Sequence, residues 1–296
     1  MSLRWRRPAR CIAVGYVLVL IGLPVALIVA RSLAPGVATL WASITTPAAL
    51  SALRLSLLLV AIVVPVNVVF GVATAILLAR CRFRGKRLLE SLLDLPFAVS
   101  PVIVGLAVVL LWGTGGVLAR LAKELGVNVF GLPGMVAASI FVTAPFVVRE
   151  VEPVLREIGP EPEQASAMLG ARPWQTFRMV TLPGIRWGLT YGVVLTIART
   201  LGEYGAVMQV SANNPGVSPT LTLLVSARDQ RGDEYGSYAI STLMMAIAVL
   251  VLLVQAGITS HGRRAAVKRD TAVESIGEKG SFDDTGDHPA RHLQTL

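Results

Sequence analysis

Two opposite charges, Arg199 and Glu203, stand inside an apolar stretch of this sequence that is long enough to cross a membrane. They are four residues apart, so on a helix their side chains lie one turn from each other and can pair. Charges at such a depth cost several kcal/mol and are functional candidates by default. Two interpretations stay open: a buried ion pair that locks this helix to its neighbours, or the lining or gate of an anion pathway, which would include Tyr204.

A polar insert over 149–187 carries the second set of candidates. The prolines and glutamates within 160–163 suit the first turn of a helix and the positive end of its dipole. Gly170 suits a left-handed stop, so the pattern predicts a short helix that ends there. Pro173 could open a second short helix that ends near Val180.

The first of these short helices has a small apolar face. Ala165, Met168 and Leu169 follow the i, i+3, i+4 spacing that places side chains on one side of a helix. A helix of about two turns is not stable alone in water and must pack on something. The face either folds back on its own helix bundle or binds a partner subunit.

The composition places these candidates in a membrane protein. The chain has 296 residues, of which 54% are hydrophobic and 15% charged, with a mean hydropathy of +0.66. Such values are too apolar for an ordinary soluble domain. Six stretches are long enough to cross a bilayer as helices, and they span roughly 11–30, 55–79, 95–112, 130–148, 189–210 and 238–258. The sequence therefore predicts an all-α protein with six transmembrane helices.

Basic residues predict the orientation of these helices. Of the 27 Lys and Arg, 20 lie in the N-terminal segment, the loop after the second stretch, the insert and the C-terminal segment. Six lie in the opposite loops, and Arg199 is the remaining one. The excess of Lys and Arg marks the cytoplasmic side, so both termini and the insert are expected there. The net charge of +9 is thus a topology signal and gives no reason to expect nucleic-acid binding.

The insert resembles the "EAA" coupling loop of permease subunits of ATP-binding-cassette importers. The matching residues are Gly170, Ala171, Trp174, Phe177, Leu182 and Pro183. Gln164 and Ser166 depart from the general pattern, because they stand where a glutamate and the second alanine are usual. The shifted opening Glu163-Gln164-Ala165 is similar to the sulfate and molybdate branch of these importers.

A second segment carries the same resemblance. Gly202-Glu203-Tyr204-Gly205-Ala206 looks like the Gly-Glu-Phe-Gly-Ala run of sulfate and molybdate permeases, with Tyr204 in place of Phe. Asp94-Leu95-Pro96 and Ser100-Pro101, near the third apolar stretch, also resemble the family at that point. Gly184, Gly188 and Gly192 recur every four residues and predict a close approach between helices.

The resemblance implies a type I importer permease fold and a role in sulfate or thiosulfate import as the second permease subunit. It also implies partners: a dimer of ATPase subunits, another permease subunit and an extracytoplasmic sulfate-binding protein, all at a bacterial cell membrane. The ATPase would bind the loop over 161–183, through Glu163, Gln164, Ala165, Ser166, Met168, Leu169, Gly170, Ala171, Leu182 and Pro183. Membrane lipid would surround the helices.

Alternatives stay open at this point. Molybdate or tungstate is the second choice of cargo, since these oxyanions share the shape and charge of sulfate. A self-sufficient channel or an intramembrane enzyme is a different class, and it would leave the coupling loop unexplained. The sequence does not distinguish a homodimeric from a heterodimeric permease core.

A missing phosphate-binding motif, the positions of the histidines and the composition of the C-terminal segment further limit the possible functions. No phosphate-binding Gly-x4-Gly-Lys-Ser/Thr loop occurs, so ATP hydrolysis is expected in a separate subunit and no cofactor is expected here. The three histidines lie at or beyond the end of the last stretch, which speaks against a catalytic or metal site in the membrane. We expect a permease domain over 1–262 and a polar, disordered tail over 263–296.

Overall fold

The computed structural model describes residues 12, 14–124, 126, 128–211 and 219–257, and all regular secondary structure within these ranges is helical. The predicted all-α class is confirmed. Contacts divide the chain into residues 1–251 and 252–296, and only 252–257 of the second unit are described. The predicted tail over 263–296 lies outside the described residues.

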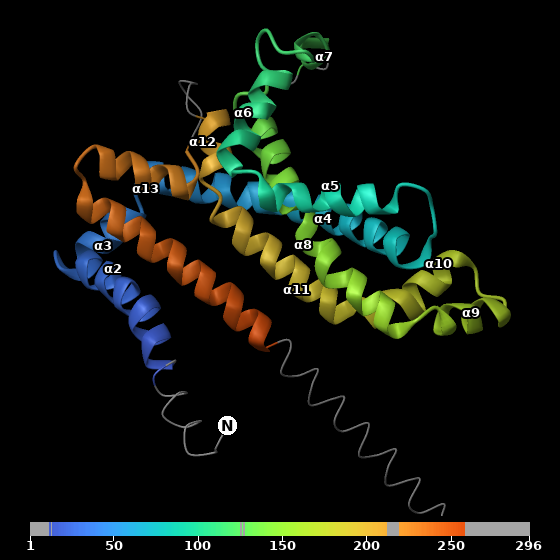
Figure 1. Cartoon of the computed structure of the whole chain (residues 1–296). Helices are drawn as coiled ribbons and strands as arrows, with labels where there is room; N and C mark the ends of the chain where they lie inside the picture. Colours follow the sequence, from blue (N-terminus) through green and yellow to red (C-terminus); the bar gives the residue numbers. More distant parts are fainter. Residues whose placement is uncertain (1–11, 13, 125, 127, 212–218, 258–296) are drawn as a thin grey trace, which may run out of the picture. The chain divides into compact units, whose positions relative to one another are not determined.

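Four of the described helices are long and apolar enough to cross a membrane. They are Val14–Leu33, which includes the π-helical η1 (Leu18–Gly22) and α2 (Leu23–Leu33), α4 (Pro47–Arg80), α8 (Leu132–Ile158) and the helix Glu234–Gly257. They cover most of the stretches expected over 11–30, 55–79, 130–148 and 238–258. The chain is therefore a multi-pass membrane protein (Figure 1).

The third predicted stretch, 95–112, is not one straight helix. α5 (Lys86–Ala98) and α6 (Pro101–Trp112) meet at an angle of 109° and would count as a fifth span if they cross the membrane together. The bend follows from Pro101, which has no N–H to continue the ladder and forces Ser100 into an extended conformation, with ψ 135°. Hydropathy alone did not indicate this bend.

The fifth predicted stretch, 189–210, is interrupted. α11 (Leu182–Leu201) ends before Gly202, and α12 (Gly205–Ser211) starts after Tyr204. The prediction of a continuous helix is wrong here, because residues 202–204 leave the helical ladder and the chain changes direction (Figure 1). Glu203 therefore lies in the break itself, where it has backbone groups to satisfy.

The insert contains one separate short helix, whereas the sequence predicted two. α8 continues to Ile158, and α9 (Glu161–Met168) is a separate short helix, as predicted. The second short helix does not end near Val180: α10 (Pro173–Thr176), the π-helical η2 (Phe177–Thr181) and α11 follow one another without a gap. The wide π turn directly precedes Pro183, whose missing N–H and bulky ring an ordinary α-helical turn would not accommodate.

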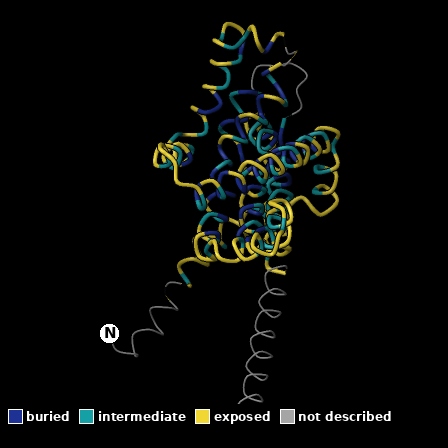
Figure 2. The backbone as a smooth tube through the Cα atoms, turned by 90° about the vertical axis from the view of Figure 1, so that its right-hand side faces the viewer, coloured by how far each residue is buried: buried dark blue, intermediate teal, exposed yellow. Residues whose placement is uncertain are grey.

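The packing centre lies between α4, α8 and α11. Leu78, Val148 and Ile185 are among its fully buried side chains, and Figure 2 shows that buried positions lie inside the bundle while exposed ones lie on its outside. Two of the three predicted glycines bring α11 close to α8: a Cβ at Gly188 would lie 2.5 Å from the Glu150 carbonyl oxygen. Gly192 likewise faces the backbone of α8.

A second contact joins the two interrupted segments. α12 packs on α6, where a Cβ at Gly105 would lie 3.0 Å from the Cα of Ala206 and one at Gly205 would lie 3.1 Å from Val102. The bend before α6 and the break before α12 are thus neighbours. The remaining described helices are α3 (Val37–Ile44), α7 (Ala119–Glu124) and α13 (Leu221–Gln230).

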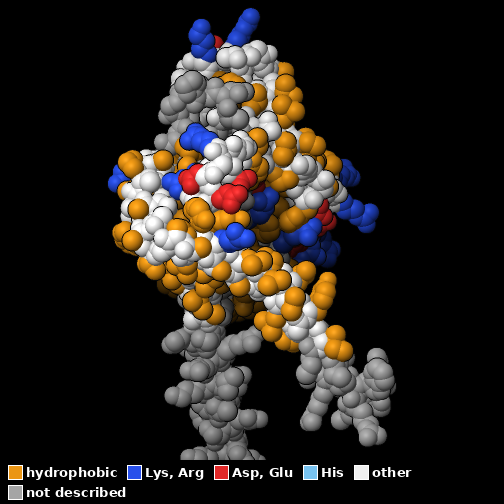
Figure 3. All heavy atoms as spheres, turned by 90° about the vertical axis from the view of Figure 1, so that its left-hand side faces the viewer, with side chains coloured by type: hydrophobic (Ala, Val, Ile, Leu, Met, Phe, Trp, Pro, Cys, Tyr) orange, Lys and Arg blue, Asp and Glu red, His pale blue; other side chains and the backbone are white. Residues whose placement is uncertain are grey.

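Apolar side chains cover much of the face drawn in Figure 3, as a membrane protein requires. Many of the exposed apolar side chains lie on long apolar helices or on α6, including Leu20, Val69 and Leu110. Lipid or other membrane subunits would cover such surface, because large apolar patches are not stable against water.

We predict that Gly188→Ala destabilises the protein and that Gly184→Ala does not. Both changes favour the helix by the same amount, roughly 1 kcal/mol, so their difference isolates the close approach to α8. At 188 the new methyl group meets backbone, whereas at 184 its nearest neighbour is the flexible Ile158 Cδ1 at 3.1 Å. Overpacking of roughly 1–3 kcal/mol should lower the melting temperature of the purified Gly188→Ala protein. Equal melting of the two variants would contradict this packing.

Candidate functional site

The glycine end of α9 has the predicted left-handed geometry. Gly170 has φ +83°, its N–H donates to the carbonyl of Ala167 at 3.0 Å, and the Ala171 N–H donates to Ser166 at 3.2 Å. These two bonds form a Schellman motif, which closes a helix by satisfying its last carbonyls. A Cβ at Gly170 would touch nothing within 4 Å, so the backbone conformation alone favours glycine here.

The apolar face of α9 is open. No residue of α9 is buried, and Met168 and Leu169 are 83% and 89% exposed. Trp174, which stacks on Phe177 at 5.4 Å, and Met179 are further exposed apolar side chains, on the α10 and η2 segments that follow α9. We call Ala165, Met168, Leu169, Trp174 and Met179 the coupling surface, and each of them is exposed.

Glu163 does not belong to this surface, because its carboxylate contacts its own chain. Oε2 accepts from Arg80 Nε at 2.8 Å, and Oε1 accepts from the Thr181 hydroxyl at 2.9 Å. Arg80 Nη2 also donates to Oε1 at 3.4 Å. Glu163 therefore links α9 to the end of α4 and to η2.

The other predicted coupling residues divide between the two sides of the insert. Gln164 is exposed beside the coupling surface. Ser166 forms a hydrogen bond of 3.1 Å with the Thr176 hydroxyl, and Leu182 packs against the core between α4, α8 and α11. Pro183 is exposed and follows the π turn. The predicted set thus contains both outward residues and residues that hold the insert in place.

The break between α11 and α12 is organised by Glu203. Its Oε1 accepts from the Ala206 N–H at 2.9 Å, so the side chain caps the first turn of α12. Its backbone carbonyl accepts from the Thr222 hydroxyl at 2.9 Å, which ties the break to α13. The side chain is 1% exposed. A carboxylate at this place satisfies backbone groups that the break leaves without helical partners.

Arg199 and Glu203 form the predicted ion pair across the end of α11. Nη1 of Arg199 lies 2.6 Å from Oε2 of Glu203. These two atoms do not have the geometry of a hydrogen bond, so the interaction of Oε2 with the guanidinium is electrostatic attraction alone. The Arg199 side chain is 33% exposed, whereas its partner is almost fully buried. The two charges are therefore in different environments: Glu203 is part of the fold, and Arg199 reaches a surface.

Tyr204 does not join this pair. Its hydroxyl lies 3.1 Å from that of Ser226, on the rim of a hollow of about 690 Å³. Side chains from α13 and from the helix Glu234–Gly257 line the hollow, and most of its polar groups are hydroxyls. Its lining consists of Ile28, Tyr204, Thr222, Val225, Ser226, Asp229, Ser237, Tyr238, Ser241 and Met244.

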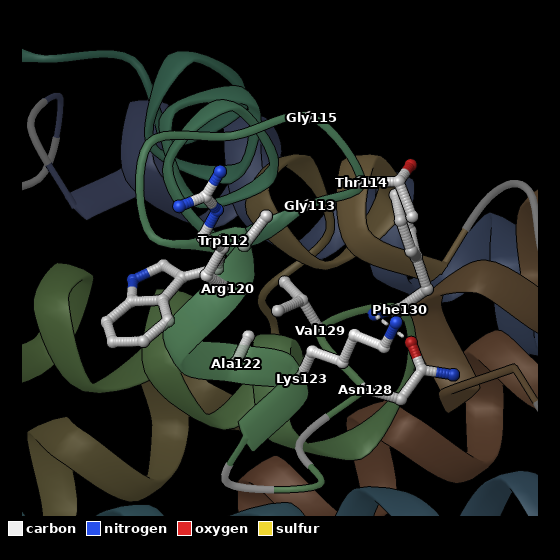
Figure 4. Close-up of a pocket in the computed structure, with 11 residues that line it drawn as sticks. Trp112, Gly113, Thr114, Gly115, Arg120, Ala122, Lys123, Asn128, Val129 and Phe130 are labelled. Atoms are coloured by element: carbon white, nitrogen blue, oxygen red, sulfur yellow. Dashed lines mark hydrogen bonds between the residues drawn. The ribbon is translucent and has the colours of Figure 1, made fainter.

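A second hollow, of about 450 Å³, lies between the end of α6 and the start of α8 (Figure 4). Trp112 and the glycine turn after it form one part, and α7 contributes the cations Arg120 and Lys123. Asn128 accepts from the Phe130 N–H at 3.0 Å and closes the loop. The residues Gly113, Gly115 and Gly116 form a turn, in which the Gly116 N–H donates to the Gly113 carbonyl at 2.8 Å.

Sequence reasoning missed several polar groups that organise the helices. Asn67 donates to Thr143, between α4 and α8, at 2.5 Å, and both side chains are fully buried. Arg228 donates to the Ser43 carbonyl at 3.2 Å and to the Thr46 hydroxyl at 2.9 Å, joining α13 to the start of α4. Each pair is far apart in the sequence, so no local spacing could indicate it.

Comparison with protein families gives a match over residues 71–264 to the binding-protein-dependent transport system inner membrane component. The match begins inside α4 and includes the coupling surface and the break at Glu203. It covers more than half of the chain.

Relatives with assigned names agree with this match. The sulfate transport system permease protein CysW of Escherichia coli is 42% identical over 78% of this chain and 80% of its own. CysT of the same organism is 35% identical over 80% and 86%. Sulfate permease 2, chloroplastic, of Chlamydomonas reinhardtii is 42% identical over 82% of this chain but only 66% of its own length.

A solved structure shows the same fold at low sequence identity. A bacterial alginate ABC transporter, in complex with an alginate-bound periplasmic protein, contains a chain with a TM-score of 0.68 and 16% identity. The similarity covers 85% of this chain and 92% of that one. The structural similarity shows the fold, while the match over residues 71–264 and the 42% identity to CysW show that the chain belongs to the family of binding-protein-dependent transport system inner membrane components.

Proposed function

We propose that this chain is the membrane-spanning permease subunit of an ATP-driven importer of sulfate or thiosulfate. It would form part of the translocation pathway and couple to a separate ATPase. The named relatives are sulfate transport permeases, and we assign the same role to this chain. The chain is 42% identical to CysW and 35% identical to CysT of the same organism, which supports its assignment as the second permease subunit.

The coupling surface carries this proposal. An eight-residue helix that buries none of its residues has no internal reason to expose Met168 and Leu169 almost completely. A partner that covers them would remove this apolar area from water, which stabilises the complex by about 25 cal/mol for each Å² buried. The family match makes an ATPase subunit the expected partner.

The assembly follows from the same role. The core would contain this chain and another permease subunit, with a dimer of ATPase subunits on the cytoplasmic side and a sulfate-binding protein outside. We propose six spans, in which α5 with α6 and α11 with α12 are the third and fifth, in a bacterial plasma membrane. The permease domain would cover 1–262, with a separate cytoplasmic tail over 263–296.

The two charges at the break are proposed to contribute to the pathway. Arg199 is one-third exposed, so its guanidinium can present positive charge to a passing dianion. Tyr204 and the hydroxyls beside it offer hydrogen bonds without a net charge. Half-helices that end inside a membrane are places where transporters bind substrate, which supports assigning Arg199, Glu203 and Tyr204 to this role.

The first prediction from the proposed function tests coupling. Gly170→Val should abolish the left-handed stop, since a β-branched residue at φ +83° is strained. In proteoliposomes with the ATPase and the second permease, sulfate uptake and stimulated ATP hydrolysis should fall at least about tenfold, the effect of losing about 1.4 kcal/mol. Gly170→Asn is the matched control, because asparagine tolerates this conformation. Wild-type coupling in Gly170→Val would refute the assignment.

The second prediction tests topology. In a protein without Cys11 and Cys81, a single cysteine at Glu234 should react with a membrane-impermeant thiol reagent on intact cells. Cysteines at Arg84 or Trp174 should react only after the membrane is opened. All three positions are exposed in this chain, and the cells used lack the ATPase that would cover Trp174, so burial does not explain a lack of reaction. Labelling of position 84 or 174 on intact cells would overturn the six-span orientation.

The third prediction separates a pathway role from packing. The double variant Arg199→Gln/Glu203→Gln removes both charges, while the amide oxygen at 203 can still cap the Ala206 N–H. It should assemble normally but import sulfate more slowly. Glu203→Leu is the contrasting variant: it removes the cap, worth about 1 kcal/mol, and leaves Arg199 without its partner. Full uptake by the double variant would show that the pair only holds the fold.

A further inference from the structure

Arg80, the last residue of α4, makes more connections than its place at a helix end requires. Its Nη1 donates to the Leu155 carbonyl at 2.8 Å, and its Nη2 donates to the Gly159 carbonyl at 2.7 Å. Both acceptors are at the end of α8, where carbonyls lack helical partners. The remaining bonds go to the Glu163 carboxylate. One guanidinium therefore joins α4, α8 and α9.

This cluster, which we call the Arg80 junction, also reaches α11. Thr181, at the end of η2, is buried and donates to Glu163 Oε1 at 2.9 Å, and α11 begins at the next residue. The side chains of Arg80 and Glu163 are 15% and 24% exposed. Water therefore competes weakly for these bonds, unlike for an ordinary surface ion pair.

The junction is the main restraint on α9. Because α9 buries no residue, apolar packing does not fix its direction. The Ser166 bond to Thr176 is a second polar attachment, but it joins α9 only to α10, within the insert. The Arg80 junction is the attachment that leads from α9 to the ends of the long helices.

We propose that Arg80 is a positioning residue for coupling. It fixes α9 to α4, α8 and, through Glu163 and Thr181, to α11, so that a displacement of the coupling surface moves the helices of the pathway. In this arrangement Glu163 serves as an internal strut and not as a contact for the ATPase. The inference rests on the proposed function, because it requires a partner that moves α9.

The chemistry requires arginine. The guanidinium is a planar fork of five N–H donors, and here it serves two carbonyls and both oxygens of one carboxylate. A lysine keeps the charge, but its single ammonium group cannot reach four acceptors in this plane. Arg80→Lys is therefore a stringent variant, since it preserves the charge balance and tests the geometry.

The experiment uses the complete complex of permeases and ATPase in proteoliposomes, with sulfate as the cargo. Arg80→Lys, Glu163→Gln and Thr181→Val each weaken the junction at a different atom. Arg84→Gln is the control, because Arg84 lies in the same basic loop and is exposed. We expect the sulfate imported per ATP hydrolysed to fall at least about tenfold in Arg80→Lys, with the amount of bound ATPase within about twofold of wild type. Such a tenfold loss corresponds to about 1.4 kcal/mol.

The two milder variants guard against a folding defect in Arg80→Lys. Glu163→Gln keeps an acceptor for Thr181 but loses the ionic bond, and Thr181→Val removes one hydrogen bond. Each should lower the import per ATP by a smaller factor than Arg80→Lys. A purely structural role would instead reduce import and hydrolysis together, in proportion to the complex recovered, and would overturn the proposal.

Hydrogen exchange on the purified permease measures the junction without transport. In Arg80→Lys, backbone amides over 161–171 should exchange at least about tenfold faster, while those in the middle of α4 and α8 remain protected. Unchanged exchange in α9 would refute the junction even if transport fell. If the wild-type complex imports no sulfate, the proposed function fails, and faster exchange would still support the junction as the restraint on α9. Faster exchange with unchanged import per ATP would refute its role in coupling.

Discussion

The structure depends on one constraint: a helix that ends or breaks near a membrane leaves backbone N–H and C=O groups that apolar surroundings cannot satisfy. In this chain, charged side chains supply the missing partners. Arg80 serves the carbonyls at the end of α8, Glu203 serves an N–H at the start of α12, and Arg228 serves the Ser43 carbonyl in the last turn of α3. These three charges are thus the groups that allow the helices to end where they do, although a hydropathy profile marks only Glu203 among them as unusual.

The breaks have a consequence for packing. Where a helix stops in the middle of the bundle, its successor can point in a new direction, and α6 and α12 do so together. They pack on each other through Gly105, Gly205 and the backbone of Ala206. The long helices α4, α8 and α11 form a layer with close contacts at Gly71 and Gly188, and α8 of this layer also packs on α6 and α12. The break at Glu203 is where α11 of this layer connects to α12, so a displacement of α11 would reach α12 and its contact with α6.

The apolar stretches could be predicted because hydropathy and length decide which segments enter a bilayer. The stop of α9 at Gly170 could be predicted because a left-handed residue requires glycine locally. The breaks were missed because a window of hydropathy averages over residues 99–100 and 202–204. Gly202 and Gly205 around an acid could have indicated one of them. The Arg80 junction had no such signal, since Arg80 and Glu163 are 83 positions apart and meet only in the folded chain.

Arg199 and Glu203, the two charges at the break, therefore have unequal structural roles. Glu203 is buried, caps α12 and holds α13, so its loss disturbs the fold before any question of transport arises. Within the described residues, Arg199 donates no comparable hydrogen bond to the backbone. A third of its side chain is exposed. A buried carboxylate that neutralises an exposed guanidinium keeps a cation stable at membrane depth. Under the proposed pathway role, a passing dianion would compete with Glu203 for the same guanidinium, so that its binding at this point would be weak and reversible.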